Sequence, residues 1–156
     1  MVKSVNFDDY QKTQTNYKDT NFLQSAEMAK LQLSRNHIGE VEALVFERDG
    51  LIVGQTIIVY RRSFRIFRKA LLLHGPLLDY NSITDLPDLL EVLILYLKKK
   101  NIASLSIHPY LTNLIRNEEL EILEEDKADE VSKVFEKLGF EQYLDCLLYT
   151  SPSPRD

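Results

Sequence analysis

LLLHGPLLDY, residues 71–80, is the stretch that decides how this chain folds. Its first three leucines are typical of a buried strand, but Gly75 and Pro76 then interrupt the apolar run before two more leucines follow. Proline has no backbone N–H to donate, so hydrogen bonding to a neighbouring strand stops at this position. We therefore expect a strand to end here at a rim of the sheet, with a groove beside it. The alternative is a tight turn whose leucines fill the core and whose Asp79 caps the next helix.

Upstream of this break, the sequence predicts an antiparallel meander. Asp49 and Gly50 separate two β-rich runs, and an Asp-Gly pair in that position is the strongest short-range signal for a hairpin. A helix with an N-cap serine precedes the meander. The expected elements are a helix over residues 21–36 capped by Ser25, and strands over residues 42–48, 51–62 and 66–73.

Downstream of the break, the pattern predicts a helix followed by another strand. Apolar residues at helical spacing from Leu86 to Leu97 predict the helix, and the Ser and Asp within residues 82–85 have capping-box spacing. Residues 102–107 alternate between apolar and serine side chains, as a half-buried strand does. Strand, helix and strand imply a right-handed parallel crossover, which brings the C-terminal ends of both strands to one edge. We therefore expect His74 and His108 at the same rim.

The two ends of the chain give weaker signals. Residues 1–6 are compatible with a strand, and residues 8–17 with a surface helix or loop. Residues 117–129 are acidic and lead into a helix closed by Gly139, and we interpret the acidic run over residues 118–130 as a solvated face. A last strand is expected from Phe140.

The composition is that of one soluble domain. The chain has 156 residues, of which 44% are hydrophobic and 28% charged, enough for one core but too few for two ordinary domains. Its formal net charge is -5, so contact with a phosphate backbone needs a local basic patch. No apolar stretch is long enough to span a membrane, no signal core is visible, and a single cysteine cannot form an internal disulfide. A cytoplasmic location is the expectation.

The C-terminal tail CLLYTSPSPRD, residues 146–156, has two interpretations. It reads as a strand end followed by a Ser/Pro-rich disordered terminus. A back-translation of the same stretch also resembles the adapter used in transposase-based sequencing libraries. We favour the second interpretation, in which these residues are non-native and the natural reading frame continues past Asp145.

The predicted order of elements is compatible with the acetyltransferase-like (GNAT) fold. That fold is α/β (α+β), with a mixed, mostly antiparallel sheet, a parallel strand-helix-strand crossover and flanking helices. Its CoA-using members carry a glycine-rich loop after the fourth strand, whose backbone N–H groups hold pyrophosphate. Here the junction from His74 to Tyr80 has one glycine, one proline and two bulky leucines. A CoA pyrophosphate therefore has no obvious cradle.

Four short motifs resemble those of the FemABX family, the peptidoglycan interpeptide-bridge aminoacyltransferases. Residues 74–80 are similar to its Arg-Gly-Pro-apolar-apolar-Asp-Tyr motif, and residues 21–25 to its Phe-x-Gln-Ser/Thr helix start. Residues 107–111 resemble its Ile-Asp-Pro-Tyr-Leu, and residues 138–141 its Leu-Gly-Phe-Glu. Four matches in the same order are far more specific than any one motif.

The resemblance implies a reaction and its partners. An amino acid would pass from aminoacyl-tRNA, the co-substrate, to an amino group on the stem peptide of a lipid-linked or UDP-linked muropeptide, with no metal or redox cofactor. The family has two GNAT-like halves, so residues 1–145 would be the first half, the second half would be missing, and this fragment alone would be inactive. Contact with the inner face of the membrane would be peripheral.

The same resemblance places candidate substrate-binding residues at the rim and on the first helix. His74 and His108 replace an Arg and an Asp of the family motifs, and we hypothesise that their side chains touch. Without a third ligand they are expected to be polar rim residues rather than a metal pair or general base. A family lysine that contacts precursor phosphate falls at Gln32, and the nearby Lys30 points to another face. The full set is His74, Gly75, Pro76, Asp79, Tyr80, His108, Lys30 and Gln32.

No catalytic residue can be assigned from the sequence, because an activated ester and an amine need mainly positioning and the loss of one proton. The chain also has a local positive patch: Arg61, Arg62, Arg65, Arg68 and Lys69. It suits lipid headgroups, muropeptide pyrophosphate or a tRNA backbone, although a hairpin with solvated charges is the simpler interpretation. Two other functions stay open: a CoA-dependent GNAT N-acyltransferase, and a non-catalytic module that binds lipid or RNA through this patch.

Overall fold

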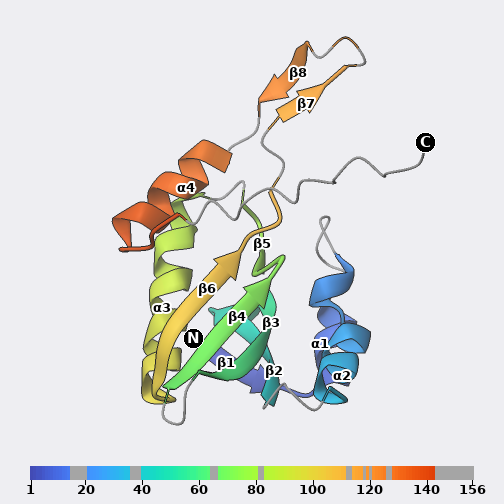
Figure 1. Cartoon of the computed structure of the whole chain (residues 1–156), viewed down its shortest axis with the longest axis vertical. Helices are drawn as coiled ribbons and strands as arrows, with labels where there is room; N and C mark the ends of the chain where they lie inside the picture. Colours follow the sequence, from blue (N-terminus) through green and yellow to red (C-terminus); the bar gives the residue numbers. More distant parts are fainter. Residues whose placement is uncertain are drawn as a thin grey trace, which may run out of the picture.

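A twisted sheet runs through the middle of the molecule, with helices on both of its faces (Figure 1). This computed structural model describes residues 1–14, 21–35, 40–63, 67–80, 83–111, 114–117, 119, 121–125 and 128–142. The strands of the main sheet are β1 (Val2–Val5), β2 (Glu40–Arg48), β3 (Leu51–Ser63), β4 (Phe67–Leu73), β5 (Leu77–Leu78) and β6 (Ile102–His108). Their order across the sheet is β1-β2-β3-β4-β6, and β5 pairs with β3.

The helices are α1 (Phe7–Gln14), α2 (Ala26–Leu33), α3 (Leu86–Lys99) and α4 (Ala128–Lys137), with short 3₁₀ helices η1 (Phe22–Gln24) and η2 (Ile83–Asp85). A separate hairpin consists of β7 (Leu114–Arg116) and β8 (Ile122–Glu125). None of the described helices combines the length and the apolar character that crossing a membrane requires.

The meander and the crossover predicted from the sequence are both present. β1 to β4 pair antiparallel in order, and the Asp49–Gly50 turn joins β2 to β3. Both turn residues have positive φ, 51° at Asp49 and 79° at Gly50, as a two-residue hairpin turn of type I′ requires. β4 and β6 pair in parallel on either side of the α3 connection. The C-terminal ends of β4 and β6 therefore meet at one rim, as expected.

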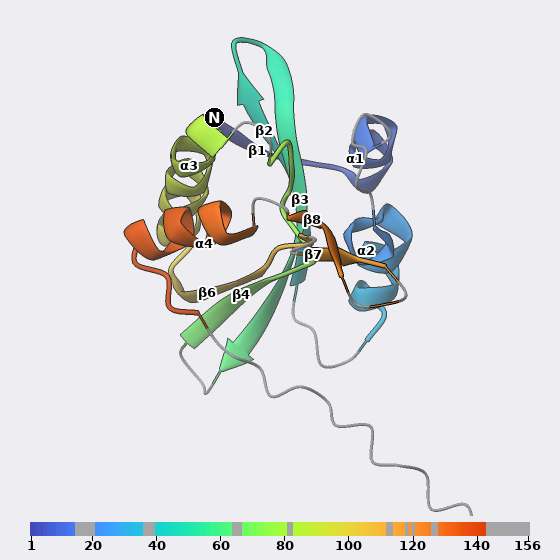
Figure 2. The ribbon, with the colours of Figure 1, turned by 90° about the horizontal axis from the view of Figure 1, so that it is seen from above.

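Two apolar clusters hold the helices to opposite faces of the sheet. On one face, Leu89, Leu93 and Leu97 of α3 are buried against side chains of β2, β3 and β4. On the other face, Tyr10 of α1 and Ala29 of α2 are buried against β2 and β3. Figure 2 shows α1 and α2 beside β2 and β3, whereas β4 and β6 lie away from them. The second face of β4 and β6 is thus bare of helices within the described residues.

The starts of two helices test the capping predictions. Ser25 caps α2 as expected, because its Oγ accepts a hydrogen bond from the Met28 N–H at 3.1 Å. Asp85 stands at the N-cap of α3, but its side chain makes no capping bond there. It forms an ion pair with Arg48 at 2.7 Å. The predicted capping box also needs Ser82, so it stays a prediction. Ser82, the other member of that prediction, lies outside the described residues.

The C-terminal part differs from the sequence prediction in two ways. The acidic stretch contains β8, which pairs antiparallel with β7 in a hairpin that the sequence did not predict. Gly139 closes α4 with φ of 82°, but no strand begins at Phe140. The Phe140 N–H bonds back to the Phe135 carbonyl at 3.0 Å, and their rings meet edge to face. This is a Schellman-type helix end, which ties Phe140 to α4 and keeps it out of the sheet. The tail, residues 146–156, lies outside the described residues and stays a prediction.

Candidate functional site

The chain leaves β4 at His74 and re-enters the sheet as β5. His74 has a positive φ of 52°, and the Gly75–Pro76 peptide is cis. The sequence predicted that the two parallel strands separate at this glycine and proline. β4 and β6 pair through Leu73 and His108, the last residue of each, so their pairing ends directly before Gly75 and Pro76, as expected. The pairing is also interrupted on the other side of β4, between β4 and β3.

Gln24 occupies the interruption. Its side chain is 1% exposed, and its Oε1 accepts a hydrogen bond from the Ile57 N–H of β3 at 2.7 Å. Its Nε2 donates to the Leu73 carbonyl of β4, also at 2.7 Å. Next to it, the Nδ2 of Asn21 donates to the His74 carbonyl at 2.8 Å. The first two sequence motifs, 53 residues apart at Asn21 and His74, are therefore in direct contact.

The third motif reaches the same place through Tyr110. The imidazole of His74 stacks on the Tyr110 ring, with centroids 5.3 Å apart and planes inclined by 24°. Within the described residues, neither a hydrogen bond nor a ring contact joins His74 to His108. The contact that we hypothesised between the two histidines is thus replaced by one between His74 and Tyr110.

Tyr80 stabilises the chain at the strand break from the side of the sheet that α3 covers. Its hydroxyl donates to the Pro76 carbonyl at 2.8 Å, and its side chain packs against the buried cluster of Leu86, Leu90 and Val131. Burial raises the pKa of Tyr80 well above the ordinary value for tyrosine, so the hydroxyl stays a neutral donor at physiological pH. Asp79 beside it is exposed.

The two candidates on α2 lie elsewhere. Lys30 is exposed and forms a 3.2 Å ion pair with Asp8 of α1, which fits the plain interpretation of a surface helix lysine. Gln32 is buried, with its Nε2 at 3.5 Å from the Met28 sulfur and its Oε1 without a hydrogen-bond partner. Neither side chain bonds to the rim residues.

The positive patch is split between the two faces of the β3–β4 ladder. Arg61 lies opposite Lys69, and Arg62 lies opposite Arg68. Arg68 is held by an ion pair with Glu40 and lies over the Tyr60 ring at 5.1 Å. Arg61, Arg62 and Lys69 are exposed and form no ion pair with any other described residue. The fifth member, Arg65, lies outside the described part of the chain.

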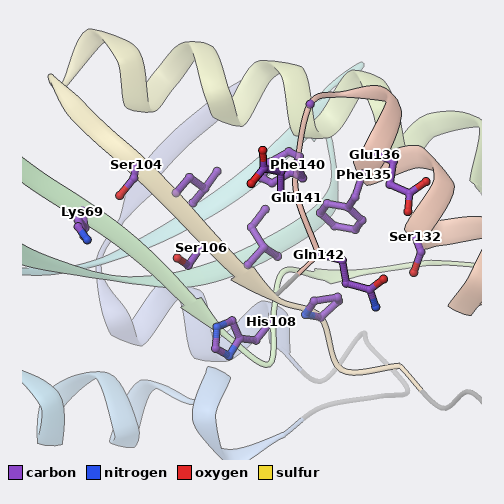
Figure 3. A pocket seen from close by; sticks show the side chains of 14 residues that line it. Lys69, Ser104, Ser106, His108, Ser132, Phe135, Glu136, Phe140, Glu141 and Gln142 are labelled. Atoms are coloured by element: carbon purple, nitrogen blue, oxygen red, sulfur yellow. The ribbon is translucent and has the colours of Figure 1, made fainter. Parts of the chain in front are cut away.

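A cavity of about 840 Å³ lies beside β6. Figure 3 shows Lys69, Ser104, Ser106 and His108 along β4 and β6, with α4 and the segment Gly139–Gln142 on the other side. The strand side supplies one cation, one imidazole and hydroxyl groups. The opposite side includes residues of the fourth sequence motif, which therefore lies close to the third.

Two residues of the site had no assigned role in the sequence analysis. Gln24 lies within residues 21–25 and Tyr110 within residues 107–111, and the sequence predicts no individual role for either. The available signal was a glutamine directly before the N-cap Ser25, in a motif that resembles one of a known family. In the part of the chain that the structure describes, no three His, Cys, Asp or Glu side chains gather in a group able to hold a metal ion.

Comparison with protein families gives one match over nearly the whole chain. The sequence model described as the FemAB family matches residues 3–146. No curated protein sequence matches the chain.

Solved structures share the fold. The crystal structure of FemX superposes with a TM-score of 0.68 and 14% identity, covering 90% of this chain and 32% of FemX. An aminoglycoside acetyltransferase from an uncultured soil metagenomic sample, in complex with sisomicin, has a TM-score of 0.57 and 13% identity, covering 97% of this chain and 96% of its own. A ribosomal-protein-alanine N-acetyltransferase from Brucella melitensis biovar Abortus has a TM-score of 0.51 and 14% identity, covering 92% of this chain and 97% of its own. The predicted GNAT-like fold is confirmed.

Proposed function

The chain belongs to the FemAB family, and on that premise we propose that it takes part in transferring an amino acid from aminoacyl-tRNA to the stem peptide of a peptidoglycan precursor. One observation carries the proposal beyond the family match: the family-like motifs converge in space. Gln24 bonds to Leu73, His74 stacks on Tyr110, and Gly139 lines the same cavity as His108. Motifs that are far apart in sequence but adjacent in the fold are typical of a binding site.

We propose that residues 1–145 are one of two GNAT-like halves. The chain spans about a third of FemX, at 32% of its length, which leaves room in a protein of that length for a second unit of similar size. A reaction centre shared between halves would be incomplete in this chain, so binding of the acceptor is the activity expected of it. Aminoacyl-tRNA is cytoplasmic, and we place the protein there, with any membrane contact peripheral.

The proposed reaction needs little acid-base help from the protein. The amine of the stem peptide attacks the ester carbonyl of aminoacyl-tRNA, a C–N bond forms, and the C–O ester bond breaks. The tRNA ribose oxygen leaves and takes up the proton that the amine loses. Bringing amine and ester together in a fixed orientation can supply much of the rate enhancement. This agrees with a site made of stacked rings and fixed backbone rather than a triad of charged residues.

The face of β4 and β6 that no described helix covers carries groups that could bind the acceptor. His74 and Tyr110 provide a flat stacked surface at the rim, where the exposed Asp79 could hold the stem-peptide amine. Lys69 and the hydroxyls of β6 lie along the cavity further from the rim, where a precursor phosphate could bind. One extended ligand could therefore span both regions.

Titration of the ¹⁵N-labelled full chain with a UDP-linked muropeptide tests the proposal. We expect saturable amide shifts around His74, Tyr110 and Lys69, and smaller shifts with the matched sugar nucleotide that lacks the stem peptide. Acetyl-CoA, followed by thermal shift, serves as the competing ligand. Stabilisation by acetyl-CoA together with no response to the muropeptide would favour a CoA-dependent N-acyltransferase and reject the proposal.

A further inference from the structure

The strand break is built on a register difference. β3 and β4 pair with Val59 opposite Leu71, so the same register would continue with Ile57 opposite Leu73. β5 resumes pairing with Leu77 opposite Gln55. Three residues of the β4–β5 strand, His74 to Pro76, therefore stand against one residue of β3. An excess of this kind bends a strand away from its partner, as β-bulges do.

The carboxamide of Gln24 takes the place of the missing ladder contact. A carboxamide carries the same donor and acceptor groups as a peptide unit. Here the acceptor takes the Ile57 N–H and the donor takes the Leu73 carbonyl, both at 2.7 Å. These are the two backbone groups that would face each other if the register continued. The Thr56 hydroxyl also donates to the same oxygen at 3.2 Å, so the amide is held from both strands.

Gly75 leaves space for the Gln24 carboxamide. A Cβ added at Gly75 would lie 2.7 Å from both Cδ and Nε2 of Gln24, closer than real Cβ atoms approach other atoms. Glycine has no Cβ, so the backbone of Gly75 can pack directly on the Gln24 carboxamide. Gln24 and Gly75 are therefore complementary: one fills the space that the other leaves.

We propose that Gln24 is a positioning residue that holds the β3–β4 break open and so presents His74 to Tyr110. The carboxamide keeps Leu73 apart from β3, and Asn21 fixes the His74 carbonyl one residue further on, at 2.8 Å. Together they define where the His74 ring leaves the sheet. The consequence for ligand binding rests on the proposed function, whereas the positioning of the ring pair does not.

A double-mutant cycle tests the complementarity of Gln24 and Gly75. Gly75→Ala alone should lower the folding equilibrium constant by about tenfold or more, because the new methyl group overlaps the carboxamide. In the Gln24→Ala background the same change should cost about threefold or less, because the overlap is gone. Urea unfolding measures all four proteins. Equal costs in the two backgrounds would overturn the contact on which the proposal depends.

A second measurement separates positioning from plain stability. Gln24→Ala should abolish the nuclear Overhauser contacts between the His74 and Tyr110 rings, with the protein still folded. Val59→Ala, a buried change on the same face that leaves the break intact, should lower stability but keep those contacts. If Gln24→Ala also keeps them, Gln24 is structural only and the proposal fails. If the ring contacts respond as expected but wild-type protein ignores the muropeptide, the proposed function fails and the positioning role stands.

Discussion

Lys100 donates hydrogen bonds to both carboxylate oxygens of Glu42, at 2.8 and 2.7 Å, across 58 positions of sequence. Glu42 on β2 is only 9% exposed, and the hydroxyls of Tyr60 and Tyr96 bond to it as well, at 2.6 and 2.7 Å. A buried carboxylate is tolerated when its oxygens are saturated in this way. The cluster ties the C-terminal end of α3 to the sheet, at the end of β4 opposite the strand break.

Replacing Glu42 should weaken the fold more than replacing a surface carboxylate. Glu42→Gln leaves Lys100 beside a neutral amide and should lower the free energy of unfolding by about 2 kcal/mol. The matched control is Glu40→Gln, which removes a more exposed ion pair with Arg68 and should cost less than about 1 kcal/mol. Urea unfolding at neutral pH measures both. Equal costs would mean that the cluster contributes no more than a surface pair.

The same cluster predicts a loss of stability in acid. Burial alone would raise the pKa of Glu42, but hydrogen bonds from Lys100, Tyr60, Tyr96 and Ser4 outweigh it and lower the pKa. A carboxyl group whose pKa is lower in the folded state stabilises the protein above its unfolded pKa and loses that effect as the pH falls through its folded pKa. The stability difference between wild type and Glu42→Gln should therefore shrink below about pH 4. A constant difference from pH 7 to pH 3 would contradict this.

Tyr80 predicts a loss of stability in alkali. Because burial raises its pKa, its contribution is complete below the unfolded pKa of about 10 and is lost as the pH rises toward the folded value. Tyr80→Phe should cost about 1 kcal/mol at pH 7, through the lost bond to the Pro76 carbonyl, and should be less sensitive to alkali. Urea unfolding at pH 7, 9 and 10.5 checks both parts. An unchanged alkaline slope in the variant would assign that slope to other tyrosines.

Local signals predicted the parts of the fold that depend on local chemistry. The Asp49–Gly50 turn and the Ser25 cap follow from neighbouring residues, because positive φ and a free side-chain oxygen are properties of a few adjacent positions. The parallel crossover followed from the chirality of strand-helix-strand units. The ion pair between Asp85 and Arg48 could not be predicted in this way, because local spacing does not show which distant cation a side chain will meet.

The central feature of the site could not be predicted in the same way. Gln24 acts on Leu73 and Ile57, which lie 49 and 33 residues away, and no periodicity encodes such a contact. Motif resemblance identified the right segments, but which side chains touch depends on how η1 and the sheet pack. The break between β4 and β3 was not predicted for the same reason, because it is occupied by a side chain from outside the strands.

Gly54 predicts how closely β5 must approach β3. A Cβ at Gly54 would lie 2.2 Å from the Leu78 Cδ2 and 3.3 Å from the Leu77 carbonyl oxygen. Gly54→Ala should therefore push Leu78 aside and lower the free energy of unfolding by about 1–3 kcal/mol. Gly50→Ala is the contrast: its Cβ meets open space, so its cost of about 1 kcal/mol comes from positive φ alone. Only Gly54→Ala should broaden the amide signals of β5, as heteronuclear NMR would show.

The unpaired cations of the β3–β4 ladder predict where a phosphate binds. Arg61 and Lys69 lie directly opposite each other, an arrangement that is unfavourable by a fraction of a kcal/mol unless an anion shares them. Replacing both by Ala should weaken binding of the UDP-linked muropeptide by about tenfold at 50 mM salt and flatten its salt dependence. Arg68→Ala is the matched control and should have a smaller effect, because Glu40 already neutralises Arg68. Calorimetric titration at 50 and 200 mM salt measures each variant. An equal loss of affinity in Arg68→Ala would contradict a specific phosphate site, because it would show that only the overall positive charge of the β3–β4 hairpin matters. Unchanged affinity in the double variant would show that Arg61 and Lys69 are solvated charges that do not contact the ligand.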